Sequence, residues 1–401
     1  MYGQKEETMK YQENLFDEMI KFRRWMHQHP ELSENEKETA AKIHEMLSFF
    51  GIEHQCNVGG YGISAIVRGR QPGPTVAAKT DIDALPVTEK WPSDFTSLNT
   101  GVMHACGHDA NTAILLGTAI QLKSMEKELK GNVKFFFECA EETVGGGELM
   151  VKEGCMKNPD VDAVIGLHVM PYLDTGMVEV KNGCLNAATN EVEIIVHGIP
   201  GHAAEPESCI DPIVVLSYII TALQTYVSRN TAATDSAVLT FGMIKGGTKG
   251  NIIPESATAK GTLRTLLPEQ REHAKKRISE ITEHIALGFG AHAELHITDS
   301  YDAVINDEKI TDVITETAEK LLGRGAITVK EKPSMGAEDF SFYTKAAKGA
   351  YFHLGCRKPG EKEIYALHTD QFHLDEACIE TGIRIQCEIL LSLMERTDLY
   401  V

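Results

Sequence analysis

Short apolar runs separated by amphipathic stretches dominate the first part of the chain. Residues 12–50 have a helical pattern that is interrupted at His29-Pro30 and stops at Gly51. Four short apolar runs then follow, at 62–67, 75–78, 133–137 and 163–167. A helical stretch at 111–125 separates the second run from the third. Strands that alternate with helices in this way predict an α/β layer with a mostly parallel sheet.

The order of the apolar segments changes from about residue 186 onward. The pattern there predicts a strand at 191–196, a helix at 210–227, strands at 237–244 and 257–264, a helix at 269–287 and a strand at 292–298. This βαββαβ order is that of a ferredoxin-like unit. The earlier pattern resumes near residue 308 and ends in a helix over 375–396. We therefore predict a catalytic domain made of residues 1–185 and 303–401, into which residues 186–302 are inserted as a smaller domain.

The length of the chain bears on the number of domains, and its net charge bears on the classes of molecule that it can bind. A chain of 401 residues suits two domains, and its acidic residues exceed its basic ones by 58 to 39. The formal charge of −19 argues against binding to nucleic acid or anionic lipid and favours a small-molecule partner. The N-terminal stretch lacks the apolar core of a signal peptide, and the longest apolar-rich run, 213–223, is too short to span a bilayer. We expect a cytoplasmic protein whose nine scattered cysteines are mostly reduced.

The chain offers a set of candidate metal ligands, some of which follow predicted strands. The glutamate pair Glu141-Glu142 follows the third apolar run and His168 ends the fourth, and the set also includes the closely spaced Cys106 and His108 and the histidine His368. Thiolate, imidazole and carboxylate groups bind zinc-like divalent cations, and ligands at the carboxyl ends of parallel strands meet at one edge of a sheet. The combination predicts a two-metal hydrolytic site with zinc as the first expectation. A histidine taken alone is more often an ordinary packed or solvent-facing side chain than a ligand, which holds for His168 and His368, whereas the sequence Cys-Gly-His favours His108 as a ligand.

Two pairs of acidic residues have further roles in this prediction. Adjacent side chains usually point apart, so we expect one of Glu141 and Glu142 to bind metal and the other to act as general base. The alternative for this pair is a solvated helix face. Asp81 and Asp83 alternate at a strand end and therefore face the same side. One of them is expected to orient a metal-bound histidine, although either also suits the cap of the following turn.

The predicted inserted domain carries three polar residues beside turn signals, namely His202, Asn251 and Arg264. An arginine and an asparagine in such positions suit a substrate carboxylate, because the guanidinium fork matches the geometry of that group. A surface salt bridge is an equally good interpretation of Arg264.

With these residues identified, the sequence resembles the M20 metallopeptidase family. Within it, the chain is similar to the amidohydrolase branch, which includes hippurate hydrolases, auxin-conjugate hydrolases and N-acetyl-diaminopimelate deacetylases. The matching motifs run through nearly the whole chain, at residues 25–32, 80–86, 103–109, 140–142, 166–169, 201–204, 211–213, 251–254, 336–340 and 367–368.

The resemblance implies that Cys106, His108, Glu142, His168 and His368 bind two divalent metal ions per subunit. Zinc or manganese is expected, with cobalt or nickel as further options. It also implies that Glu141 is the general base and that Asp83 supports the site. The inserted domain would be a lid and a homodimerisation domain, with His202 polarising the scissile carbonyl and Asn251 and Arg264 near the substrate carboxylate.

The resemblance implies hydrolysis of the amide bond of N-acyl amino acids. A dipeptidase of the same family is one alternative, and a metal-binding protein without turnover is another. The chain departs from the usual pattern at Lys79-Thr80, at Cys139 and at Met170. These departures leave every ligand and the base in place. Cys139 would add a second thiol near the metals if it faced them.

Overall fold

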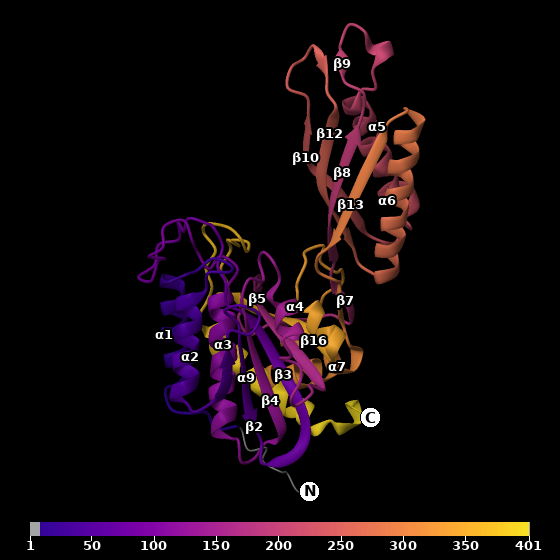
Figure 1. The fold of residues 1–401 in the computed structure, drawn as a ribbon. Coiled ribbons are helices and arrows are strands. Elements are labelled where there is room, and N and C mark those ends of the chain that lie inside the picture. The colour runs from indigo at the N-terminus through magenta and orange to yellow at the C-terminus, as the bar shows by residue number, and fades with distance from the viewer. Residues whose placement is uncertain (1–8, 401) are drawn as a thin grey trace. The chain divides into compact units, whose positions relative to one another are not determined.

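The computed structural model describes residues 9–400, which form two compact units (Figure 1). The first unit runs to Gly183 and also includes Asn306–Glu331 and the chain from Phe342 onward. The second unit comprises Cys184–Ile305 and Lys332–Ser341. Among residues 9–400, no helix has both the length and the apolar character needed to cross a bilayer.

The first unit is an α/β layer. Its helices are α1 (Leu15–Gln28), α2 (Lys37–Phe49), α3 (His108–Ser124), α4 (Gly146–Lys152), α7 (Glu308–Leu322), α8 (Ser341–Ala346) and α9 (Ala377–Glu395). Its main strands are β1 (Glu53–Cys56), β2 (Ile63–Arg68), β3 (Gln71–Asp81), β4 (Lys130–Glu138), β5 (Ala163–Asp174), β6 (Val178–Val180), β15 (Ile327–Val329) and β16 (Lys348–Arg357). These strands form one sheet in the order β1-β2-β4-β3-β5-β16-β6-β15.

The centre of this sheet is parallel, as the alternation of strands and helices predicts. β4, β3, β5 and β16 pair in parallel, whereas β1 and β2 pair antiparallel at one edge. The central strands are buried almost without interruption, which is the pattern of strands covered on both faces. Helix α3 is buried from His108 to Leu122 and packs against α9, and both helices contact β3. The start of α3, at which the candidate ligands lie, is therefore held by the core of the unit.

The second unit has the βαββαβ order. It contains β8 (Ala188–His197), α5 (Pro212–Thr225), β10 (Ala237–Gly246), β12 (Ser256–Thr265), α6 (Pro268–Gly288) and β13 (His292–Asp299). Two short strand pairs complete it: β9 (Gly201–His202) with β11 (Ile252–Ile253), and β7 (Gly183–Asn186) with β14 (Val304–Asn306). The antiparallel sheet has the order β10-β12-β8-β13. Helices α5 and α6 bury apolar side chains against it, among them Leu216, Ile219 and Ile278. The predicted α/β fold class is thus confirmed.

A buried carboxylate on β6 contributes an acid-sensitive part of the stability of the first unit. Glu179 Oε1 accepts hydrogen bonds from His353 Nδ1 at 2.8 Å, from Tyr172 Oη at 2.6 Å and from Lys330 Nζ at 2.9 Å. Burial raises the pKa of Glu179, but these hydrogen bonds outweigh it and lower the pKa to about 2. An unfolded glutamate has a pKa of about 4.3. This stabilisation is therefore complete above about pH 5 and is lost as the pH falls towards 2.

We expect Glu179→Gln to lower the thermal midpoint at pH 7, because the glutamine cannot replace the charged acceptor. The difference from wild type should shrink as the pH is lowered from 5 to 3, because the glutamate of the unfolded wild type becomes protonated there while the folded carboxylate stays charged. Scanning calorimetry across this range measures the effect, with the exposed neighbour Glu331→Gln as control. A difference that stays constant from pH 7 to pH 3 would contradict the assignment.

Candidate metal centre

The five predicted metal ligands all lie in the first unit, on segments that are far apart in the sequence. Cys106 precedes α3, His108 is its first residue, Glu142 lies in the turn after β4, His168 lies in β5, and His368 lies in the loop between β16 and α9. The backbone N–H of His368 donates to the carbonyl of Ala105 at 2.8 Å. This hydrogen bond fixes the loop from the C-terminal part of the chain beside Cys106.

The ligand atoms of these residues converge. Cys106 Sγ lies 3.4 Å from His168 Nε2 and 3.3 Å from His368 Nε2. Glu142 Oε1 lies 3.2 Å from His368 Nε2. The ligand atoms of Cys106, His108 and His168 are all within 4.8 Å of one another, and so are those of Cys106, Glu142 and His368. Two overlapping sets of three ligands therefore share the sulfur of Cys106.

The two buried histidines are oriented by hydrogen bonds from their far nitrogen atoms. His108 Nδ1 lies 3.0 Å from the carbonyl oxygen and 3.2 Å from Oδ1 of Asp83, and His168 Nδ1 lies 2.7 Å from the carbonyl oxygen of Val169. Each ring therefore donates through Nδ1, and its Nε2 faces away from these oxygen acceptors. For His168 that direction is towards Cys106. Such outer partners are typical of histidines that bind metal.

The electrostatics of this group suit a cation. Burial raises the pKa of the Cys106 thiol to about 12 and lowers the pKa of His168 well below its ordinary value. Burial also lowers the pKa of His108, but Cys106 and the carboxylate of Asp83 outweigh it and raise that pKa well above the ordinary value. A thiolate, two imidazoles and a carboxylate at these distances are groups that a divalent cation binds, and its positive charge would favour the deprotonated form of each. The residues present therefore fit divalent metal ions.

Glu141 and Glu142 do not point apart, which corrects the expectation drawn from their adjacency. A carboxylate oxygen of each residue lies within 4.8 Å of the other and of a ring nitrogen of His108. The reason is the backbone: Ala140, just before the pair, has a left-handed φ of 61°, and the pair lies in an irregular turn rather than in a strand or helix. The alternation that governs regular elements does not apply there.

Asp83, rather than Asp81, contacts a candidate ligand. In addition to His108, the side chain of Asp83 accepts from the backbone N–H of Glu142 at 3.0 Å and from Ser33 Oγ at 2.8 Å. Burial raises the pKa of Asp83, but these hydrogen bonds lower it below the usual value. Asp81 instead pairs with the buried Lys79, whose Nζ lies 2.6 Å from Asp81 Oδ1. Asp83 therefore links the segments that carry His108 and Glu142.

Two further residues lie around the site, Glu36 and Cys139, and the sequence alone gives little or no indication of their roles. Glu36, immediately before α2, is fully buried, and its Oε1 accepts from the backbone N–H of Ala140 at 2.7 Å. It thereby holds the turn that carries the glutamate pair, and burial raises its pKa to about 7. An acidic residue at a helix start is ordinary, so only packing reveals this role. The thiol of Cys139 donates to the carbonyl of Gly59 at 3.2 Å, which directs it to the backbone of a neighbouring loop.

The predicted catalytic residue His202 and the two predicted substrate-binding residues, Asn251 and Arg264, lie in the second unit, where they do not form one group. His202 pairs with Ile252 across β9 and β11, and the next residue, Ala203, donates to the carbonyl of Asn251 at 3.2 Å. His202 and Asn251 are thus neighbours and both exposed. β12 begins at Ser256, shortly after β11, and Arg264 lies near its far end. At a rise of about 3.3 Å per residue, Arg264 is about 26 Å along the strand from Ser256. Its guanidinium donates to the carbonyl of Met335 at 3.1 Å. Within one unit, Arg264 and Asn251 cannot contact the same carboxylate.

Comparison with known proteins gives a consistent result. The model of peptidase family M20/M25/M40 matches residues 77–392. N-acetyl-L-cysteine deacetylase of Bacillus subtilis is 37% identical over 365 residues, which cover 91% of this chain and 85% of that protein. N-acetyldiaminopimelate deacetylase of Streptococcus sanguinis is 36% identical over 368 residues, which cover 91% of this chain and 95% of that protein.

A solved structure agrees with these relatives. The crystal structure of the YXEP protein of Bacillus subtilis, a dinuclear metal-binding peptidase of the M20 family by its description, superposes with a TM-score of 0.83. The two chains are 34% identical, and the match covers 95% of this chain and 99% of that one. The predicted resemblance is confirmed, and so is the prediction of an enzyme of the amide-hydrolase class. The chain belongs to peptidase family M20/M25/M40.

Proposed function

We propose that this hydrolase cleaves the amide bond of N-acyl amino acids at a site that binds two divalent metal ions. The observation that carries the proposal is the convergence of Cys106, His108, Glu142, His168 and His368 on two overlapping sets of ligand atoms. Relatives with 36% and 37% identity over most of the chain are named as deacetylases of N-acetylated amino acids. They support the acyl-amino-acid class of substrate.

The proposed chemistry assigns a role to each group. Cys106, His108, Glu142, His168 and His368 would hold the divalent cations, which when bound would supply Lewis acidity that lowers the pKa of water to about 7 and polarises a carbonyl oxygen. Glu141 takes a proton from the attacking water and delivers it to the leaving amine nitrogen, so that one water is consumed and a carboxylic acid and an amine are released. Asp83 holds His108 in the tautomer that keeps Nε2 free.

The residues of the second unit complete the proposal. His202 would stabilise the negative charge that develops on the carbonyl oxygen, while Asn251 and Arg264 would bind the substrate carboxylate. Because Arg264 lies at the opposite end of β12 from His202 and Asn251, these contacts require two copies of the unit. The homodimer predicted from the sequence would provide them, with each end supplied by a different protomer. The homodimer and a cytoplasmic location both stay predictions.

A hydrolysis screen tests the proposed activity. Protein stripped of metal is reconstituted with zinc, manganese, cobalt or nickel and incubated with N-acetyl, N-benzoyl and indole-acetyl amino acids, while amine release is measured. We expect turnover that depends on added metal, and much weaker turnover of N-acyl amines that lack the carboxylate. Cleavage of unblocked dipeptides in preference to the acyl compounds would contradict the proposed substrate class. Failure of all four metals to support turnover would contradict the mechanism.

A further inference from the structure

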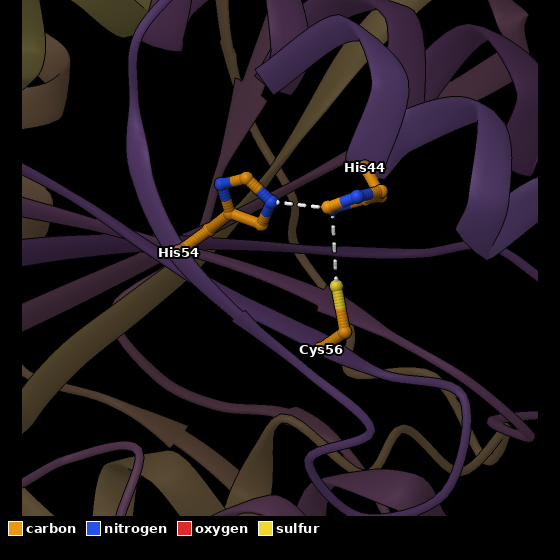
Figure 2. A group of neighbouring side chains, drawn as sticks. All are labelled: His44, His54 and Cys56. Atoms are coloured by element: carbon orange, nitrogen blue, oxygen red, sulfur yellow. Dashed lines mark hydrogen bonds between the residues drawn. The ribbon is translucent and has the colours of Figure 1, made fainter. Parts of the chain in front are cut away.

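A second group of metal-ligand side chains lies at the edge of the large sheet, on elements that do not contribute to the metal centre. His44 extends from α2, and His54 and Cys56 extend from the edge strand β1. Figure 2 shows the three side chains pointing towards one another. Their ligand atoms lie within 4.8 Å of one another. The group is at least partly open to solvent, since His44 is exposed and the other two are half-buried.

Local structure explains why the three side chains meet. His54 and Cys56 are two residues apart on β1, so they share one face, while Glu53 and Gln55 on the opposite face are exposed. Helix α2 packs against β1, and a short connection over 50–52 joins the two elements. His54 Nδ1 donates to the carbonyl oxygen of Ile52 at 2.7 Å. The lone pair of His54 Nε2 is therefore directed towards His44.

The distances are close to those of a zinc site. His44 Nδ1 lies 2.7 Å from His54 Nε2 and 3.5 Å from Cys56 Sγ. Tetrahedral zinc, with bonds of about 2.05 Å to nitrogen and 2.3 Å to sulfur, separates two nitrogens by about 3.3 Å and a nitrogen from a sulfur by about 3.6 Å. The sulfur is already at that distance. The two imidazoles need to separate by about 0.6 Å, which a rotation of the exposed His44 side chain provides.

We propose that His44, His54 and Cys56 form an additional metal site that binds a borderline divalent cation, zinc foremost, separately from the hydrolytic centre. Two imidazoles and a thiolate are ligands that zinc prefers, and the fourth tetrahedral position is left to water. Binding would replace the proton of the Cys56 thiol with the cation. It would also join the C-terminal half of α2 to an edge strand, an element that otherwise has only one neighbouring strand. The role of the site is thus to stabilise this edge and to mask its thiol.

Metal content tests the proposal directly. Stripped full-length protein is loaded with excess zinc and desalted, and bound zinc is measured by mass spectrometry. We expect wild type to hold one ion per chain more than His44→Gln and Cys56→Ser. The matched control Gln55→Ala, on the opposite face of the same strand, should hold as much zinc as wild type. Equal zinc content in wild type and both variants would overturn the proposal. Because none of these residues belongs to the hydrolytic centre, this result does not depend on the proposed activity.

The reactivity of the Cys56 thiol provides a second test, which uses the wild-type protein. Zinc should slow alkylation of Cys56 by iodoacetamide at least tenfold, as read from peptide mass spectrometry. The half-buried Cys209 of the second unit serves as the internal reference and should react at the same rate with and without zinc. Cobalt in place of zinc should add a thiolate-to-metal absorption band that is weaker in Cys56→Ser than in Gln55→Ala. Alkylation of Cys56 at an unchanged rate in saturating zinc would exclude its thiolate as a ligand.

Discussion

Substitution of Glu141 by glutamine is expected to lower kcat about 10³-fold, which corresponds to about 4 kcal/mol of transition-state stabilisation. Glutamine has nearly the size of glutamate and keeps a carbonyl oxygen, but it cannot accept the proton of the attacking water. Glu141 is buried beside His108 and Glu142, so the substitution changes the chemistry of the site with little change in its packing. Bound metal should stay at the wild-type level.

Glu142→Gln is the matched comparison, because it makes the same chemical change one residue away. Glu142 Oε1 lies 3.2 Å from His368 Nε2 within the ligand group, so this variant should lose bound metal as well as turnover. Steady-state kinetics and metal analysis on both variants separate the two roles. Wild-type kcat in Glu141→Gln would exclude it as the base. Metal loss in Glu141→Gln equal to that in Glu142→Gln would make it a ligand instead.

Arg23→Met is expected to lower the free energy of unfolding of the first unit by about 3–5 kcal/mol. Arg23 Nε donates to Asp109 Oδ2 at 2.7 Å, and the two side chains are only 2% and 0% exposed. Burial raises the pKa of Asp109, but Arg23 and His27 outweigh it and hold the pKa well below the usual range. Without the guanidinium, the carboxylate stays buried with His27 Nδ1 as its remaining side-chain partner, at 2.8 Å. Because Asp109 follows His108, this pair also anchors the start of α3 to α1.

Urea unfolding followed by tryptophan fluorescence measures this effect in the relevant unit, since both tryptophans, Trp25 and Trp91, belong to the first unit. Lys21→Met on the same helix is the control. The Lys21 ion pair with Glu18 is exposed, so that variant should change the free energy of unfolding by less than about 0.5 kcal/mol. Adding Asp109→Asn to Arg23→Met should recover part of the loss. If Arg23→Met and Lys21→Met lowered the free energy of unfolding equally, the loss of the buried Arg23–Asp109 pair would not be the cause.

The order of helices and strands could be predicted from the sequence because burial patterns are local. The βαββαβ segment is one example: α6 has Ile278 in the core, with Ile281 and Ile285 packed against it, at the helical spacing that the sequence displays. The chemical types of the candidate metal ligands could also be predicted from the sequence, because thiol, imidazole and carboxylate chemistry is a property of the side chain itself. Placing Asp83 and Glu142 near each other required only that strand ends share an edge of the sheet.

The orientation of the glutamate pair could not be predicted from the sequence. It depends on the left-handed backbone at Ala140, where φ is 61°, and on the buried carboxylate of Glu36, which holds that residue from another element. The choice between Asp81 and Asp83 has the same origin. The two residues alternate identically in the sequence, and only the packing of Lys79 and His108 around them distinguishes their partners.

The sequence by itself therefore determined the fold class, the family and the chemical nature of the candidate ligands, since periodicity and side-chain chemistry are properties of the chain as written. Tertiary structure alone decided which atoms face one another. The length of β12 separates Arg264, near its C-terminal end, from Asn251, which precedes β11. A loop backbone with a positive φ at His368 brings that ring to Cys106. Such contacts depend on turn conformation and on packing between distant segments, and no local pattern specifies either.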